Sequence, residues 1–154
     1  MAPRVVARRP SVAAVIVGRN PPAALVRAAA ERGLRWRFTG FVDDIRPEVA
    51  AAQVSVIPLR VGSGTRMKAF ESMALGRPVV STTVGVEGLD VVPGRHLLVA
   101  DTAEAFAAAI LRLLDEPGLA GGLAEAARAL LEARFSWAQV ARQFEAVCAG
   151  VLPG

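Results

Sequence analysis

The sequence predicts an α/β fold in which a parallel sheet is flanked by helices. Short apolar runs of strand length alternate with longer segments of helical period through residues 12–100, and this alternation is typical of a parallel sheet covered on both faces. The length of 154 residues fits a single domain. An apolar fraction of 53% is enough to form a core without disulfides or metals.

Five segments have the length and apolar content of strands. The run VAAVIV ends at Gly18 as a buried strand would, and LRWRFT alternates in polarity and ends at Gly40. The predicted strands are 12–17, 34–39, 54–58, 78–81 and 96–100.

Helical segments lie between these strands and fill the remainder of the chain. Two of the later helices open with patterns typical of a capping box, Asp101 with Glu104 and Ser136 with Gln139. The predicted helices are 23–32, 43–52, 65–75, 101–115, 119–134 and 136–149. We therefore expect one domain over 1–154, with an α/β core at about 11–100 and C-terminal helices over 101–150.

Composition excludes several classes of protein. The net charge is +4, but the arginines are scattered and aromatic residues make up only 5% of the chain, which is a poor basis for nucleic-acid binding. No apolar run is long enough to span a bilayer. Arg4, Arg8 and Arg9 interrupt any signal-peptide core. The cytoplasm is the expected location, and contact with the inner face of a membrane through a basic surface stays open.

Cysteine and histidine content argue against a metal site. The single cysteine, Cys148, excludes an internal disulfide and is expected to be a small buried or half-buried hydrophobe. One cysteine and one histidine cannot supply a zinc site. Asp43 and Asp44 are adjacent and do not form an Asp-x-Asp pair, so we interpret them as the cap of a short helix. No metal or other cofactor is predicted.

The most informative segment is PLRVGSGTRMKAFESMALGRPVVS, residues 58–81, which combines a strand, a glycine-containing loop, a helix and a further strand. Ligands of open parallel sheets bind at the carboxyl ends of the strands. The loop 62–64 allows a close approach of backbone to ligand, and the helix expected to begin at Thr65 favours an anion at its N-terminus. Arg66 and Lys68 place two cations in that first turn, which suggests a phosphate ligand.

Lys68 is the only lysine in the chain, and every other lysine or arginine position is arginine. Glu71 follows three residues later and shares its helical face. One interpretation is an ordinary solvated surface pair, worth a few tenths of a kcal/mol. The other is functional: Lys68 contacts a phosphate, and the Glu71 carboxylate accepts hydrogen bonds from two vicinal sugar hydroxyls.

The stretch GSGTRMKAFESMALGRPVVSTTVGVEGL resembles the sugar-donor signature of retaining glycosyltransferases of family 4, which have two Rossmann-like domains in the GT-B arrangement. VIVGRNPP, FTGFVDDIRPEVAAAQVSVIPL and FSWAQVARQFEAV resemble further segments of that family, so the resemblance covers nearly the whole chain. It implies the C-terminal, nucleotide-sugar-binding half of such an enzyme, transferring a sugar from a nucleotide diphosphate sugar to an acceptor with retention.

The resemblance also implies which residues bind the sugar donor. Glu71 matches the second of two family glutamates and is expected to bind the ribose. Ser63 stands where the first glutamate would fall, which puts the contact to the transferred sugar in doubt. The expected donor-binding residues are Gly18, Phe41, Val42, Ser63, Gly64, Thr65, Arg66, Lys68 and Glu71. Phe41 and Val42 would lie beside the nucleobase, and the role of Glu87 stays open.

Two parts of the family pattern are not matched. The acceptor-binding domain has no counterpart in these residues, so we expect it to be supplied as a partner and assign no catalytic residue to this chain. His96, at a strand start, is interpreted as structural. The first strand of the C-terminal domain is also unmatched, since 3–10 resembles the helix that follows it. That strand normally lies mid-sheet, so unpaired strand edges are expected.

Three other functions are considered. A non-catalytic nucleotide-sugar-binding module fits the same residues without turnover. A nucleotide-sugar epimerase of related fold is a further alternative. A nicotinamide-dependent dehydrogenase is disfavoured, because no G-x-G-x-x-G opens the helix after the VAAVIV strand.

Overall fold

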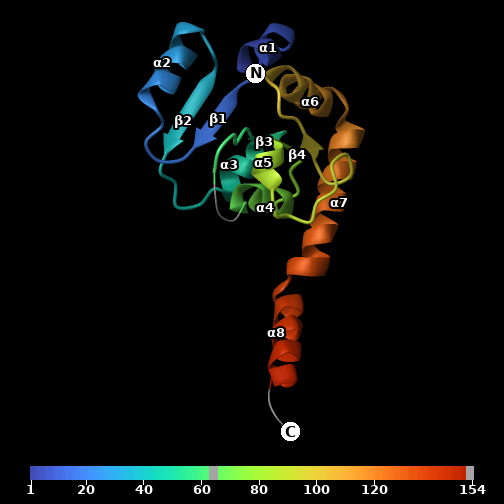
Figure 1. Cartoon of the computed structure of the whole chain (residues 1–154). Helices are drawn as coiled ribbons and strands as arrows, with labels where there is room; N and C mark the ends of the chain where they lie inside the picture. The colour runs from blue at the N-terminus through green and yellow to red at the C-terminus, as the bar shows by residue number, and fades with distance from the viewer. Residues whose placement is uncertain (63–65, 152–154) are drawn as a thin grey trace.

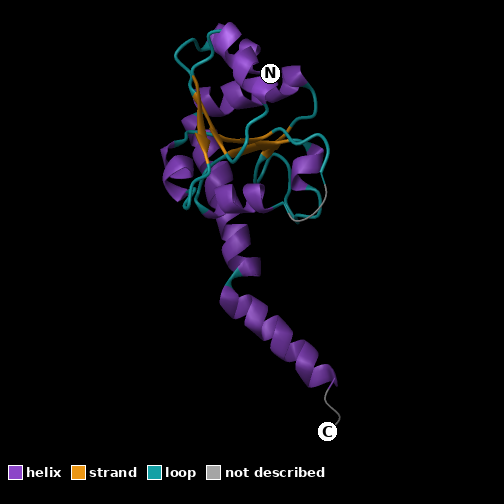
Figure 2. Ribbon diagram, turned by 90° about the vertical axis from the view of Figure 1, so that its left-hand side faces the viewer, coloured by secondary structure: helices purple, strands orange, loops and turns teal. Residues whose placement is uncertain are grey.

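The computed structural model describes residues 1–62 and 66–151. Its strands are all parallel to their neighbours and are flanked by helices, as predicted. Figure 2 shows helices on both sides of the strands. The five strands are β1 (Ala14–Val17), β2 (Trp36–Gly40), β3 (Ser55–Ile57), β4 (Val79–Ser81) and β5 (Leu98–Val99). Each lies within or one residue beyond a predicted segment.

Eight helices complete the described part of the chain (Figure 1). They are α1 (Ala2–Arg8), α2 (Ala23–Glu31), α3 (Arg46–Ala51), α4 (Met67–Ala74), α5 (Thr83–Val86), α6 (Ala103–Asp115), α7 (Pro117–Phe135) and α8 (Trp137–Val151). The short helix α5 was not predicted. It begins where the Thr82 hydroxyl accepts a hydrogen bond from the Gly85 amide at 3.1 Å. A single threonine after a strand is not enough to predict such a cap.

One predicted cap is wrong and another is confirmed. The α6 N-cap is Thr102, whose hydroxyl accepts from the Ala105 amide at 3.1 Å. Asp101 instead accepts from the amide and hydroxyl of Thr83, at 2.8 and 2.7 Å, so its carboxylate holds the start of α5. At the start of α8 the Ser136 hydroxyl accepts from the Gln139 amide at 3.4 Å, as expected.

The strands divide into two sheets, β1–β2 and β3–β4–β5. In a parallel ladder, alternate residues direct their amide and carbonyl to the same neighbour. Ala14 bonds toward β2 and Ser55 toward β4, so Val15 and Val56 direct their backbone groups to the opposite edges. Their side chains are 44% and 42% exposed. Among the described residues no strand pairs with these edges, which agrees with the expectation of an unmatched mid-sheet strand.

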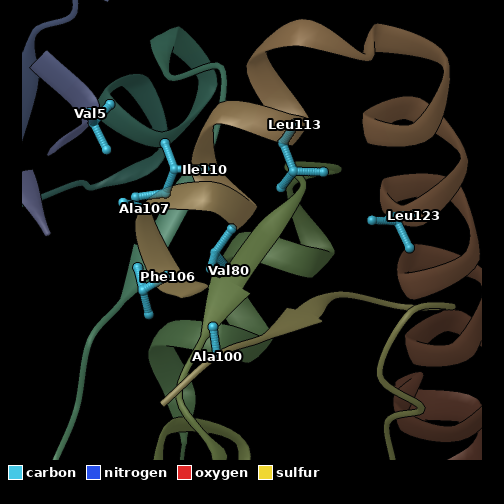
Figure 3. Packing of buried hydrophobic residues seen from close by; sticks show 8 residues of the cluster. All are labelled: Val5, Val80, Ala100, Phe106, Ala107, Ile110, Leu113 and Leu123. Atoms are coloured by element: carbon cyan, nitrogen blue, oxygen red, sulfur yellow. The ribbon is translucent and has the colours of Figure 1, made fainter. Parts of the chain in front are cut away.

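Buried hydrophobic residues form a core on each face of the larger sheet, one between the sheet and α6 and the other between the sheet and α4. On the first side, Val5 of α1 and Phe106 and Ile110 of α6 surround Val80 of the central strand (Figure 3). On the second side, Met73 of α4 and its neighbours pack against β3, β4 and α7. Both helical layers are therefore anchored on the fully buried strand β4, and the position of α4 relative to the carboxyl ends of the strands is fixed.

Helix α4 is also held from outside the sheet. Phe70 on α4 meets Phe135 at the end of α7 edge to face, with ring centroids 5.2 Å apart. Such an aromatic pair contributes roughly 0.5–1.5 kcal/mol beyond its buried area. The contact packs α4 against the end of α7.

Helix α8 extends away from the rest of the chain (Figures 1 and 2). Trp137, Phe144 and Val147 lie along it at 89%, 69% and 65% exposure, at spacings that place them on one helical stripe. Cys148, on the same helix, is half-buried and unpaired. None of the helices in the described ranges is both long and apolar enough to cross a membrane.

Candidate functional site

A groove opens beside α4 and contains the carboxylate singled out in the sequence. Its volume is about 380 Å³. Glu71 is half-buried and lies one turn into α4. The groove is lined by Asp43, Asp44, Ile45, Arg46, Glu71, Ala74 and Leu75. The segment that follows β2 therefore forms one wall and α4 forms the other, as a ligand bound across the ends of parallel strands requires.

The wall that follows β2 is stiffened by an Asp44–Arg46 pair. The Asp44 carboxylate accepts from the Arg46 amide at 2.9 Å and from Nε of the same arginine at 2.9 Å. These hydrogen bonds lower the pKa of Asp44 below its ordinary value. The predicted cap is wrong, because the N-cap of α3 is Ile45 and no side chain of the described residues caps the helix; Asp44 bonds to Arg46, the first residue of α3. Asp43 lines the groove instead.

Lys68 is exposed on the first turn of α4. Within the described ranges no salt bridge joins it to Glu71, so the surface-pair interpretation is not what the structure contains. The ammonium group is left available at the helix N-terminus, where a cation is unfavourable unless an anion binds.

Arg66 differs from Lys68 in its surroundings. Its side chain is only 7% exposed and donates to the Glu87 carboxylate at 2.9 Å. The same guanidinium donates to the Gly62 carbonyl at 3.2 Å. Arg66 thus connects the two ends of the segment 62–66 to the loop after α5. Glu87, whose role the sequence left open, is the partner that balances its charge.

Three predicted site residues, Ser63, Gly64 and Thr65, lie outside the described residues. The structure describes the residues on either side, Gly62 and Arg66, and these approach each other through the hydrogen bond above. The expected contacts of the three residues to a sugar or diphosphate stay a prediction.

Gly18, Phe41 and Val42 follow the carboxyl ends of β1 and β2. The Gly18 amide donates to the Gly40 carbonyl at 3.2 Å, which joins the two turns. Gly18 has φ of 146°, a conformation that L side chains rarely adopt. Phe41 is 63% exposed, and Val42 is half-buried. Val42 is followed directly by Asp43 of the groove wall, but Gly18, Phe41 and Val42 are not among the described residues that line the groove.

Arg19 lies in the same place and was missed in the sequence. Its guanidinium carbon is 5.0 Å from the centre of the Phe41 ring, a cation–π contact. The only local signal was an arginine after the glycine that ends β1. The two residues are 22 positions apart and meet because β1 and β2 are neighbours, which a local pattern does not contain.

A second groove, of about 320 Å³, lies at the carboxyl ends of the larger sheet. It is lined by Leu59, Arg60, Thr82, Val84 and Asp101. Hydrogen bonds from Thr83 lower the pKa of Asp101, and that carboxylate is already used to hold α5. No predicted site residue lines this groove.

His96 has the environment of a structural residue. It is 6% exposed, and its Nδ1 accepts from the Val92 amide at 2.9 Å. Burial, with a smaller contribution from Arg95, lowers the pKa of His96, which favours the neutral ring. In the described part of the chain no three His, Cys, Asp or Glu residues gather as metal ligands.

The fold is that of a Rossmann-like α/β domain, with a groove between the segment that follows β2 and helix α4. A family model for glycosyl transferases group 1 matches residues 1–116, and the chain belongs to this family.

Known proteins extend this assignment. The chain is 30% identical over 145 residues to a GDP-mannose-dependent monoacylated alpha-(1-6)-phosphatidylinositol monomannoside mannosyltransferase of Corynebacterium glutamicum, covering 88% of this chain and 38% of that protein. It superposes on sucrose-phosphate synthase from Thermosynechococcus elongatus with a TM-score of 0.81 and 27% identity, over 96% of this chain and 40% of that one. For Anabaena HepE in complex with UDP the TM-score is 0.81 at 22% identity, over 92% and 42%.

The fold is that of the C-terminal domain of a GT-B glycosyltransferase. The chain spans about two fifths of the length of each of these proteins. The activity of a whole enzyme is therefore a matter for proposal.

Proposed function

We propose that this chain binds the nucleotide of a GDP-activated hexose and forms the sugar-donor half of a family 4, retaining glycosyltransferase. The observation that carries the proposal is the position of Glu71, half-buried in a groove at the carboxyl ends of parallel strands and one turn beyond an exposed lysine. Support for guanine and mannose comes from the mannosyltransferase relative, which is GDP-mannose-dependent.

The groove suits a ribose in shape and in chemistry. Glu71 supplies a carboxylate that accepts two hydrogen bonds, and vicinal hydroxyls supply two donors at the matching spacing. Ile45, Ala74 and Leu75 supply the apolar wall against which a pentose ring packs. Arg46 and Asp44 neutralise each other at the rim, so Glu71 and Asp43 are the carboxylates of the groove without a salt bridge in the described structure.

The diphosphate would lie at the start of α4. The exposed Lys68 and the N-terminus of α4, which no side chain of the described residues caps, present positive charge there. Charge increases on the leaving diphosphate as the glycosidic bond to the transferred sugar breaks, so groups already directed at that position lower the barrier. Arg66 acts differently, because its charge is directed to Glu87 and it shapes the segment around the phosphates.

An acceptor-binding domain would complete the enzyme by closing over this groove, excluding water and orienting the acceptor hydroxyl. The exposed apolar stripe of α8 offers a surface for such a partner.

Isothermal titration calorimetry with GDP, GDP-mannose and inorganic pyrophosphate tests the proposal. We expect GDP to bind and Glu71→Ala to weaken it about tenfold or more, since hydrogen bonds to a charged group contribute about 1.5–3 kcal/mol. Glu125→Ala, an exposed change on α7, is the matched control and leaves the affinity unchanged. Failure of the chain to bind any nucleoside diphosphate would refute the proposal. Binding without mannosyl transfer, after addition of an acceptor domain, would identify a non-catalytic module.

A further inference from the structure

Glu87 and Arg66 join two segments of the chain at the start of α4. Arg66 is the residue before the first turn of α4, and its side chain is 7% exposed. It donates to the Glu87 carboxylate at 2.9 Å and to the Gly62 carbonyl at 3.2 Å. The Glu87 side chain is 71% exposed. A buried cation therefore lies at the base of the helix that carries Lys68 and Glu71, and its carboxylate partner reaches it from the surface.

Helix α5 gives Glu87 a firm support. The first residue of α5, Thr83, donates from its amide and hydroxyl to the Asp101 carboxylate at 2.8 and 2.7 Å. The Thr82 amide donates to the Ile57 carbonyl at 3.2 Å. Glu87 is the residue that follows the last turn of α5. Because α5 is bonded to the end of β3 and to the segment after β5, its far end is a fixed point from which Glu87 reaches α4.

We propose that Glu87 is a positioning residue for the diphosphate of the nucleotide and that it acts through Arg66. Lys68 lies two residues after Arg66, on the turn where the proposed function places the phosphates. A guanidinium bonded to both a carboxylate and a carbonyl holds that turn in place, so the Lys68 ammonium and the helix N-terminus keep their direction. Groups that are already directed at a developing charge need no reorganisation during the reaction.

The effect is exerted on α4 and not on the ligand. Neither Arg66 nor Glu87 is among the described residues that line the two grooves. The inference rests on the proposed function, and it adds to the donor site a residue that does not touch the donor.

The test compares the binding of pyrophosphate, GDP and guanosine to the wild-type chain and to Glu87→Ala. Calorimetry measures the first two ligands, and an NMR titration measures the weaker guanosine. We expect Glu87→Ala to weaken pyrophosphate and GDP about tenfold, since a misplacement of about 1 Å can cost roughly 100-fold. Guanosine has no phosphate, so its affinity is expected to be unchanged. Glu87→Gln keeps an oxygen that can accept from Arg66 and is expected to recover most of the affinity.

A double-mutant cycle tests whether Glu87 acts through the first turn of α4. Lys68→Ala is expected to weaken pyrophosphate less in the Glu87→Ala background than in the wild-type chain, because coupled residues are not additive. The matched control is Glu132→Ala, which also removes the carboxylate partner of an arginine but lies on α7; it is expected to alter no affinity. Circular dichroism at the titration temperature checks that each variant is folded.

The outcomes are distinguishable. If the wild-type chain binds neither GDP nor pyrophosphate, the proposed function fails and the inference fails with it. If it binds both and Glu87→Ala binds pyrophosphate as tightly, the inference alone is overturned. Tighter pyrophosphate binding by Glu87→Ala would show that Glu87 masks the charge of Arg66. An equal loss for guanosine would show a general structural role, and additive losses in the cycle would show an effect that does not pass through Lys68. Each of these three results also overturns the inference.

Discussion

The buried guanidinium of Arg66 donates to the exposed carboxylate of Glu87 at 2.9 Å. This bond links the first residue before α4 to the loop after α5, which are separated by 21 positions in the sequence. Arg66 also binds the Gly62 carbonyl. A single side chain therefore sets the separation between the loop after β3 and the helix whose first turn carries Lys68.

We expect Glu87→Ala to destabilise the chain by about 1–2 kcal/mol, because it removes a hydrogen bond between charged groups at a largely buried guanidinium. The matched control is Glu132→Ala, which removes an exposed i,i+4 partner of Arg128 and is expected to lose about 0.5 kcal/mol or less. Urea denaturation followed by circular dichroism measures both. Equal losses for the two variants would show that the Arg66 pair has no special structural role.

Alanine substitutions at Gly85 and Gly122 test the packing around each glycine. A Cβ added at Gly85 would lie 2.3 Å from the Ser81 hydroxyl and 3.2 Å from the Ile57 carbonyl. Gly85→Ala is therefore expected to destabilise the chain by about 1–3 kcal/mol, as overpacking does. At Gly122 in α7 no atom lies within 4 Å of such a Cβ, so Gly122→Ala is expected to stabilise it by about 0.5–1 kcal/mol. Thermal melts of the two variants check the opposite signs.

The single histidine predicts a pH dependence of stability. The pKa of His96 is lowered in the folded chain, so between that value and about 6.5 the unfolded chain binds more protons. The contribution of His96 to the free energy of unfolding is therefore fully present above about pH 6.5, and it is lost as the pH is lowered. The carboxylates with shifted pKa values, Asp44, Glu48 and Asp101, titrate at lower pH.

His96→Asn separates this effect from others, because the asparagine oxygen can accept from the Val92 amide without titrating near neutrality. Urea denaturation between pH 5 and 7 is the measurement. We expect a slope for the wild-type chain and a nearly flat dependence for the variant. A variant with the wild-type slope would place the titrating group elsewhere.

The two open strand edges predict fast amide exchange at defined positions. The amides of Val15 and Val56 point away from β2 and β4, so they are expected to exchange far faster than the amide of Val80 in the central strand. Hydrogen–deuterium exchange followed by NMR measures all three. Protection of Val15 and Val56 comparable to that of Val80 would mean that these edges are paired in solution.

Whether the sequence predicts an interaction depends on how far apart its two residues lie in the chain. The five strands and the α8 cap at Ser136 depend on neighbouring residues, and the sequence predicted them. Helical period predicted that Glu71 shares a face with Lys68, the resemblance predicted a donor-binding role for it, and the structure places it in a groove. The partnerships of Arg66 with Glu87, Arg19 with Phe41 and Asp101 with Thr83 join distant segments, so no local pattern contains them. Thr102 caps α6 in place of its acidic neighbour because Asp101 is engaged by α5.

The central claim is that Glu71 binds the two hydroxyls of a ribose. The most direct measurement is a calorimetric cycle with GDP and 2′,3′-dideoxy-GDP on the wild-type chain and on Glu71→Ala. We expect the wild-type chain to lose about tenfold or more of its affinity when the hydroxyls are removed, and the variant to bind both nucleotides equally at the weaker level. An equal loss from the substitution with either nucleotide would contradict the assignment of the ribose to Glu71.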